Sequence, residues 1–208
     1  MNINYNDIIS RNNPNILDVG AFDGTHSLKF ANEYPEGKIF SFEADPDVCE
    51  IFEKNINLYD LPNNNITLIK KAVGDKNGTL IFNRAIDSEE RRTGSSGTFL
   101  TPTKHLQLHP HVAFRQIEVD CITLDSWFEN EKLDYIDLAW TDVNGAEMAL
   151  LRGGQNTFKA TKYLQLECIS WALWKDQPTK NELLDLIPNF EIIHDEHTDM
   201  LLKNKELV

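Results

Sequence analysis

Apolar residues along this chain gather in short runs that alternate with stretches of helical periodicity. The short runs predict strands at residues 15–19, 38–43, 66–73, 134–143 and 163–169. The stretches between them predict helices at residues 25–34, 46–58, 146–152 and 180–187. Because strands and helices alternate, the pattern is typical of a doubly wound α/β fold built on a largely parallel sheet.

Two segments depart from this alternation. Residues 190–194 and 200–203 are extended runs separated by the polar sequence DEHTD, which predicts a C-terminal antiparallel hairpin and therefore a mixed sheet. Residues 74–127 contain the hairpin signal Asn77-Gly78, a polar stretch and a returning strand, so we expect an insertion here rather than a crossover helix. We expect residues 1–208 to form one domain that carries this substrate-loop insertion.

The sequence ILDVGAFDGTHS near the N-terminus carries the clearest chemical signal. An apolar strand passes through a glycine loop into a helix, which is how nucleoside cofactors are held. The glycines are Gly20 and Gly24, and Phe22 and Asp23 lie between them. A bulky ring blocks the close approach of a pyrophosphate and a carboxylate repels it, so a NAD-dependent enzyme is a weak alternative. The cationic nucleoside S-adenosylmethionine instead suits the carboxylates of Asp18 and Asp23.

Glu43 ends the next predicted strand, roughly 20 residues beyond the glycine loop, where an acidic residue accepts the ribose hydroxyl protons. The alternative is a negative charge at a helix start, since Asp45 and Pro46 begin the following helix. We expect Glu43 to bind ribose.

Composition narrows the class of protein. The 208 residues are 41% hydrophobic and 25% charged, which allows one good core. The formal charge of −13 argues against a nucleic-acid partner, because phosphates are bound by basic surfaces. The three cysteines are too widely spaced for a disulfide framework and indicate a reducing compartment. No apolar run approaches the roughly 18 residues that span a bilayer and no signal peptide is visible, so we expect a cytoplasmic protein with no membrane partner.

Five segments together resemble the FkbM family of S-adenosylmethionine-dependent O-methyltransferases: ILDVGAFDG, KKAVGDKNGTL, the GSSG loop, VDCITLDSW and IDLAWTDVNGAE. The resemblance covers residues 15–168 and rests on the order and spacing of these motifs. It implies a class I methyltransferase fold, a sheet with a reversed seventh strand, and methyl transfer to a hydroxyl group. We expect the acceptor to be a small molecule, such as a sugar or a glycan.

We expect the cofactor, S-adenosylmethionine, to be bound from the ends of three strands, by Asp18, Gly20, Asp23, Gly24, Glu43, Ala72 and Val73. The resemblance assigns the glycine loop to the methionine part, Glu43 to ribose, and Ala72 with Val73 to the segment beside adenine.

Asp142 is the candidate catalytic carboxylate. The resemblance matches it to the acidic residue after the fourth strand, where it would orient the acceptor hydroxyl or take its proton. The alternative is a helix N-cap, since Asp142 precedes Gly145 and a predicted helix. Asn144 completes the candidate catalytic pair, yet Asn144 and Trp140 replace the glutamate and lysine of the family pattern IDFIKIDVEGAE. Two alternatives therefore stay open: a different acceptor, or a non-catalytic cofactor-binding or scaffold protein that retains the fold.

Candidate acceptor contacts come from the insertion and from aromatic residues near strand ends. Ser95 and Ser96 lie in the GSSG loop, and loops at the carboxyl ends of strands bind substrates in α/β enzymes. Trp140 and Trp171 offer rings that can stack on a sugar. The spacing of Trp171 and Trp174 also fits a buried helix face, which is the alternative.

We expect no metal centre. Asp142 and Glu167 could approach each other at strand ends, but no third oxygen ligand is visible in the sequence. The histidines of KHLQLHPHV have no carboxylate at a matching spacing. The sequence leaves a homodimer open, because nothing in it specifies a surface or a symmetry.

Overall fold

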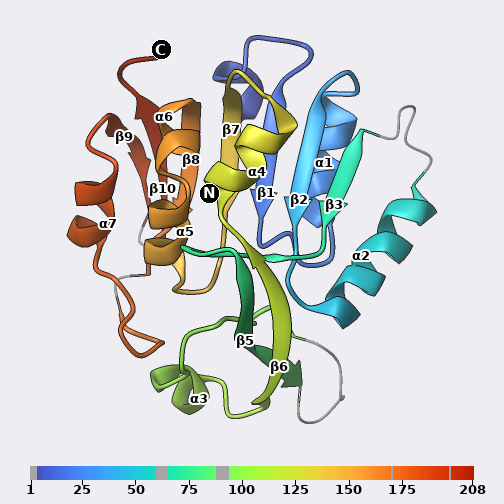
Figure 1. Cartoon of the computed structure of the whole chain (residues 1–208), viewed down its shortest axis with the longest axis vertical. Coiled ribbons are helices and arrows are strands. Elements are labelled where there is room, and N and C mark those ends of the chain that lie inside the picture. Colours follow the sequence, from blue (N-terminus) through green and yellow to red (C-terminus); the bar gives the residue numbers. More distant parts are fainter. Residues whose placement is uncertain (1–3, 60–64, 88–93, 170, 197) are drawn as a thin grey trace.

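A computed structural model describes residues 4–59, 65–87, 94–169, 171–196 and 198–208. A seven-stranded sheet runs through the protein in the order β3-β2-β1-β7-β8-β10-β9 (Figure 1). Its strands are β1 (Asn15–Val19), β2 (Lys38–Phe42), β3 (Ile66–Ile69), β7 (Ile136–Thr141), β8 (Thr161–Glu167), β9 (Phe190–Asp195) and β10 (Asp199–Asn204). The first five are parallel, and β10 is antiparallel to both of its neighbours. The predicted mixed, mostly parallel sheet with a C-terminal antiparallel hairpin is confirmed.

Helices cover both faces of this sheet. The 3-10 turn η1 (Tyr5–Asp7) and α1 (Thr25–Glu33) pack on one face. The other face carries the largest core, beneath α4 (Leu124–Glu131), α5 (Glu147–Gly153), α6 (Gln155–Lys159) and α7 (Lys180–Leu186). Helix α2 (Pro46–Leu58) follows β2 and is capped by Asp45, whose side chain accepts from the backbone N–H of Asp47 at 2.9 Å. In the described part of the chain, no helix has the length and apolar character needed to cross a membrane.

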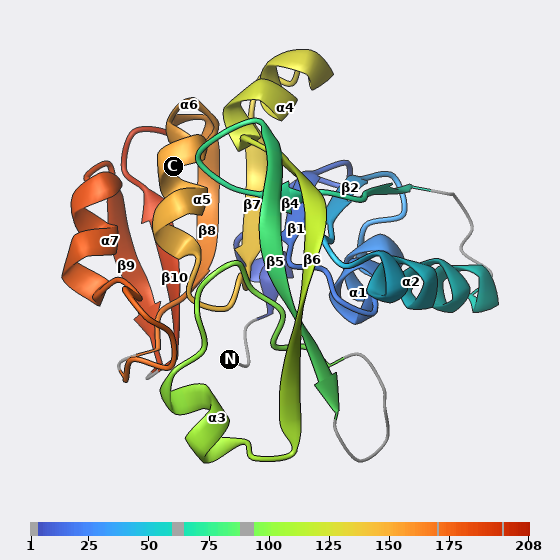
Figure 2. The same cartoon turned by 60° about the horizontal axis from the view of Figure 1, so that its bottom comes forward.

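The strand predicted at residues 66–73 is in fact two strands in two sheets. After β3 the chain turns sharply, with the Lys71 N–H donating to the Ile69 carbonyl at 2.9 Å. Strand β4 (Ala72–Val73) then leaves the main sheet and pairs with β6 (Val112–Ile122), which also pairs with β5 (Gly78–Asp87). This three-stranded sheet, with α3 (Lys104–Leu108) in the β5–β6 connection, projects from one end of the molecule (Figures 1 and 2).

Asn77-Gly78 does not form the predicted hairpin turn, because β4 and β5 lie on opposite sides of β6 and do not pair. Asn77 instead holds the start of α4. Its Oδ1 accepts from the Thr123 N–H at 2.9 Å, and its Nδ2 donates to Ser126 Oγ at 2.8 Å. The hairpin prediction is therefore wrong, and the Asn77 side chain instead supports the N-terminus of α4.

The expectation that residues 74–127 contain no crossover helix is wrong at their C-terminal end, where α4 begins at Leu124. Thr123 caps this helix by accepting from the Ser126 N–H at 3.2 Å. The helix buries Trp127 against Phe40 and Phe42 of β2, with ring centroids 4.9 and 5.3 Å apart. Since α4 covers the main sheet, only the segment before it is an insertion.

Candidate active site

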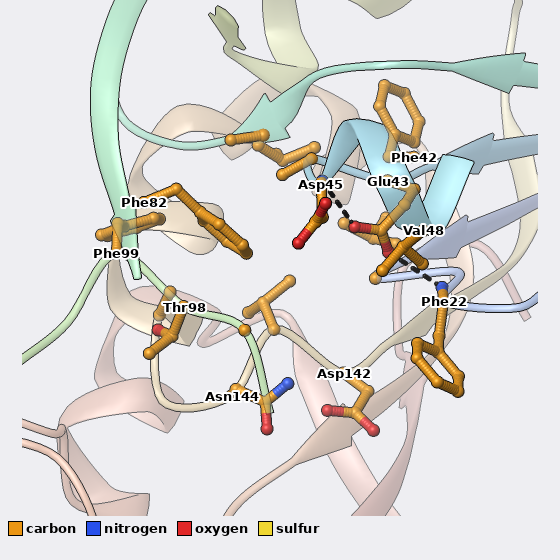
Figure 3. A pocket seen from close by; sticks show the side chains of 18 of the residues that line it. Phe22, Phe42, Glu43, Asp45, Val48, Phe82, Thr98, Phe99, Asp142 and Asn144 are labelled. Atoms are coloured by element: carbon orange, nitrogen blue, oxygen red, sulfur yellow. Dashed lines mark hydrogen bonds between the residues drawn. The ribbon is translucent and has the colours of Figure 1, made fainter. Parts of the chain in front are cut away.

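An open cavity of about 600 Å³ lies where the carboxyl ends of β1, β2 and β7 meet the β5–β6 hairpin (Figure 3). This volume includes the open space at the mouth of the cavity. The structure brings seven of the predicted site residues together in its wall: Gly20, Glu43, Ala72, Val73, Ser95, Asp142 and Asn144.

Gly20 allows the loop after β1 to pack against the loop after β7. Its φ is +85°, and a Cβ at this position would lie 1.9 Å from the carbonyl oxygen of Asp142. Its N–H donates to the Phe42 carbonyl at 3.0 Å, which ties the loop to the end of β2 as well. Only glycine fits here, and its backbone therefore forms part of the cavity wall.

Glu43 holds the same loop in place from the end of β2. Its Oε2 accepts from the Phe22 N–H at 3.0 Å, and its Oε1 accepts from the Asp45 N–H at 2.8 Å. The side chain lines the cavity and is 8% exposed, and this burial raises the pKa of Glu43 to about 7. Each carboxylate oxygen has further lone-pair capacity, so the ionised group can accept two more hydrogen bonds, as from a diol.

Phe22 also lines the cavity, although the sequence suggested only that it obstructs a pyrophosphate. Its φ of +47° is left-handed, a conformation that bulky side chains rarely adopt. The hydrogen bond from its N–H to Glu43 helps to hold this conformation. Strain of this kind is concentrated at ligand sites, which fits its position in the cavity wall.

Asp142 follows β7 and forms one side of the cavity (Figure 3). It does not cap the next helix, since α5 has Ala146 at its N-cap and no side-chain cap bond. Its carboxyl group hydrogen-bonds with that of Glu167, from the end of β8. Burial and the charge of Asp199 raise the pKa of Asp142, and burial together with Asp142 raises the pKa of Glu167 to about 10. The hydrogen bond from Glu167 acts in the opposite direction and lowers the pKa of Asp142, so Glu167 is the member of the pair that keeps its proton.

Asn144 joins the loop after β7 to the insertion. Its φ is +51°, which asparagine tolerates, and its Nδ2 donates to the Ser95 carbonyl at 3.0 Å. Ser95 belongs to residues 94–100, which we term the strap. The strap runs beside β5, where the N–H groups of Asn83 and Thr98 donate to each other's carbonyls at 2.7 and 3.2 Å.

Three of the predicted cofactor residues support the glycine loop without lining the cavity: Asp18, Asp23 and Gly24. Asp18 is fully buried and accepts from Ser27 Oγ at 2.5 Å, and burial raises its pKa to about 7. Asp23 accepts from the Thr25 N–H at 3.0 Å, and Gly24 is the N-cap of α1. From these positions the three residues fix the shape of the glycine loop, and they do not themselves line the cavity.

Ser96, Trp140 and Trp171, predicted to bind the acceptor, also lie outside the cavity wall. Trp140 faces the opposite side of the strand from Ala139 and packs under η1 and α1, with its ring 5.9 Å from Tyr5 and 4.3 Å from His26. Trp171 is 46% exposed. Trp174 is the buried member of the tryptophan pair, stacked 4.8 Å from His105.

The cavity wall includes residues that sequence reasoning did not propose. Phe82 comes from β5, Thr98 and Phe99 from the strap, and Asp45 and Val48 from the start of α2. Residues 80–82 are all apolar, so the sequence does not reveal that Phe82 is buried while Ile81 is 51% exposed. No sequence signal shows that the hairpin folds back over the main sheet.

The polar groups that line the cavity suit a cationic nucleoside. Glu43 and Asp142 present carboxylates, and Gly20 presents bare backbone beside them. Beneath the loop, Asp18 Oδ1 is buried and finds no hydrogen-bond partner among the described residues. Within the described residues, no group of three or more His, Cys, Asp or Glu side chains is arranged to hold a metal ion. Residues of this kind fit S-adenosylmethionine, which carries a ribose diol, an ammonium and a sulfonium.

The buried carboxyl groups predict an unusual dependence of stability on pH. Burial raises the pKa of Asp18, Glu43 and Glu147 to about 7 in the folded protein. Between about pH 4 and 7 the folded protein keeps protons that the unfolded chain has released, so the free energy of unfolding falls as pH rises through this interval. We expect chemical denaturation to give a larger free energy at pH 5 than at pH 8, by several kcal/mol in total.

A Glu147→Gln variant is the matched control for this pH dependence. Glu147 Oε1 accepts from the Gly145 N–H at 3.1 Å, a bond that an amide oxygen can keep. The variant cannot ionise, so its stability should change less between the two pH values. A wild-type protein whose stability is equal at pH 5 and pH 8, or greater at pH 8, would contradict the raised pKa of these buried carboxyl groups.

Comparisons with known proteins agree with this geometry. The model of the family described as the Methyltransferase FkbM domain matches residues 18–200. The 2-O-methyltransferase NoeI of Sinorhizobium fredii is 31% identical over 206 residues, which cover 96% of this chain and 83% of the relative.

Solved structures show a similar fold. A methyltransferase FkbM from Methylobacillus flagellatus superposes with a TM-score of 0.57 at 13% identity, over 92% of this chain and 43% of that one. The present chain thus spans less than half the length of that protein. A protein described as an O-methyltransferase from Klebsiella pneumoniae gives a TM-score of 0.52 at 12% identity, over 92% of this chain and 73% of the other. These likenesses show the class I methyltransferase fold.

Proposed function

Because this chain belongs to the FkbM family of S-adenosylmethionine-dependent methyltransferases, we propose that it transfers a methyl group to a hydroxyl group of a small molecule, such as a sugar. The enzyme class and the cofactor follow from the family, and both predictions from the sequence are confirmed. The name of its relative, a 2-O-methyltransferase, supports an oxygen acceptor. The '2-O' in that name denotes the oxygen on carbon 2 of an acceptor, and sugars carry hydroxyl groups of this kind.

The observation that carries the proposal is the shared wall of the cavity, in which Asp142 lies with Glu43 and the glycine loop. In this proposal Glu43 accepts hydrogen bonds from the ribose hydroxyls. The backbone at Gly20 faces the amino-acid part of the cofactor, and Ala72 with Val73 lies beside the base. When bound, the cofactor supplies a methyl group that its sulfonium already activates.

Asp142 then holds the acceptor hydroxyl and takes its proton. An ionised carboxylate is a hydrogen-bond acceptor, and the proton that Glu167 shares with it favours that ionised state. Asn144 keeps the adjoining strap in place through Ser95 and so shapes the side of the cavity from which the acceptor enters. Positioning contributes most to such a reaction, because the methyl donor is already reactive.

We expect Asp142→Asn to lower kcat by about 10²- to 10⁴-fold, the usual contribution of a proton-transfer residue. Affinity for S-adenosylhomocysteine should change far less, because Glu43 and the glycine loop stay in place. The assay is the release of S-adenosylhomocysteine in the presence of a panel of sugars and glycosides, and calorimetry gives the affinity.

Asp185→Asn is the matched control, since Asp185 is an exposed carboxylate on α7. It should leave both quantities unchanged. An Asp142→Asn variant that retains wild-type kcat removes the carboxylate from the mechanism. Wild-type protein that binds the cofactor product but methylates no hydroxyl compound in the panel contradicts the proposed acceptor class.

A further inference from the structure

The β5–β6 hairpin adds an apolar cluster to the cavity. Phe82 of β5 is buried with Ala72 of β4, and Ala44 and Phe99 pack against them. These four residues come from four separate segments of the chain: β5, β4, the loop after β2, and the strap. All four also line the cavity that contains Glu43. The insertion therefore contributes to the wall of the cofactor cavity.

The position of Glu43 restricts where a nucleobase can lie. The base is bonded directly to the ribose, so it must lie next to the ribose that the Glu43 carboxylate holds. The apolar surface next to Glu43 in the chain begins at Ala44, which contacts the cluster of Ala72 and Phe82. Figure 3 shows Phe82 and Phe99 on the side of the cavity opposite Glu43 and Val48.

The other two aromatic residues in the cavity wall are less suited to the base. Phe42 is 1% exposed, and its ring packs edge-on against Trp127 in the main core. Phe22 belongs to the glycine loop, which the proposed function gives to the amino-acid part of the cofactor. Phe82 and Phe99 are the remaining aromatic residues of the cavity wall, and they pack with Ala44 and Ala72.

The strap fixes the Phe82 ring. A Cβ at Gly97 would lie 2.7 Å from Phe82 Cζ, so the strap backbone packs directly on the ring, and a larger residue at 97 would displace it. Asn83, the next residue along β5, donates from Nδ2 to the Leu100 carbonyl at 2.7 Å and pairs its backbone with Thr98. A ring held in this way loses little conformational entropy when a ligand packs on it.

We propose that Phe82 binds the adenine ring of the cofactor, and that the insertion, with the strap behind it, forms the outer wall of the base site. The ring packs against the flat base, while Ala44 and Ala72 contact its edge. This inference rests on the assignment of Glu43 to ribose in the proposed function. It also changes the part played by the strap, which the sequence suggested only as a substrate loop.

The test is calorimetry with S-adenosylhomocysteine and with adenosine, the latter measured by displacement so that weak binding is sufficient. We expect Phe82→Ala and Phe82→Leu to weaken both ligands by the same factor, about five- to 150-fold, which is the range for loss of base–aromatic packing. If both ligands are weakened by the same factor, Phe82 contacts the adenosine part that the two ligands share. Phe82→Leu retains most of the buried volume, so it controls for collapse of the cluster.

Ile81→Ala is the matched control, because Ile81 is the neighbour of Phe82 on β5 and is 51% exposed. It should bind both ligands as the wild type does. Folded Phe82 variants with wild-type affinity overturn the proposal, and so does a loss confined to S-adenosylhomocysteine, which would place Phe82 beside the amino-acid part. Failure of the proposed function is a separate result: wild-type protein that binds S-adenosylhomocysteine but methylates no hydroxyl compound.

Discussion

Glu43→Ala is expected to weaken S-adenosylhomocysteine binding by at least about 100-fold. Two hydrogen bonds from the ribose hydroxyls to a carboxylate contribute roughly 1.5–3 kcal/mol each. The substitution also removes the acceptor of the Phe22 and Asp45 N–H groups, so the glycine loop loses one of the contacts that hold it to the end of β2. Calorimetry at pH 8 measures the effect, because Glu43, whose pKa is raised to about 7, is then mostly ionised.

Two further measurements separate this effect from a general loss of structure. Glu50→Ala, at an exposed glutamate on α2, should bind as the wild type does. Wild-type affinity should fall as pH is lowered below 7, because protonation of Glu43 removes the charged acceptor. Glu43→Gln should lose most of this pH dependence. A folded Glu43→Ala protein with wild-type affinity would refute the ribose assignment.

Arg84→Met is expected to lower the free energy of unfolding by about 3–5 kcal/mol, the usual cost of leaving a buried charge without its partner. Arg84 Nε donates to Asp45 Oδ2 at 2.7 Å and Nη2 donates to Asp45 Oδ1 at 2.5 Å, with 11% and 5% of the two side chains exposed. This pair joins β5 to the start of α2, next to the cavity. Urea denaturation measures the loss.

The double variant Arg84→Met with Asp45→Asn is the control for that prediction. Asparagine caps a helix as well as aspartate does, and it leaves no charge buried. The double variant should therefore regain a large part of the stability that Arg84→Met loses. If Arg84→Met costs less than about 1 kcal/mol, the pair behaves like an exposed surface ion pair and does not anchor the insertion.

The residues that could be predicted are those whose position follows from the end of a strand. Gly20, Glu43 and Asp142 come directly after β1, β2 and β7, and the carboxyl ends of parallel strands meet at one edge of the sheet. Right-handed crossovers limit the possible strand orders, and in the observed order β2, β1 and β7 are neighbours, so the three residues lie close together. The mixed sheet was predictable for a different reason, since a polar turn marks the C-terminal hairpin.

The residues that could not be predicted depend on how the insertion folds back. Phe82 reaches the cavity only because β4 leaves the main sheet and β6 then pairs with it. The break in the strand at residues 70–71 has no glycine or proline to mark it. The prediction that Trp140 contacts the acceptor is wrong because side chains alternate between the two faces of a strand. Trp140 lies on the η1 and α1 side of β7, away from the cavity.

The departures from the family pattern also have a partial physical account. Trp140 fills a pocket among Tyr5, His26 and Phe30, a contact that a lysine could not make as well. Asn144 donates to the Ser95 carbonyl, and an ionised glutamate at that position could not donate. Both residues are thus fitted to this structure, and neither removes Asp142 from the cavity.

The atom of the acceptor that receives the methyl group distinguishes O-methyl transfer from every other methyl transfer. Wild-type protein is incubated with S-adenosylmethionine labelled in its methyl group and with the sugar panel, and the product is analysed by NMR. We expect a labelled methyl ether on a sugar carbon, formed by the wild type and greatly reduced with Asp142→Asn. A labelled methyl group on nitrogen or carbon, or an ether formed equally well without the Asp142 carboxylate, would contradict it.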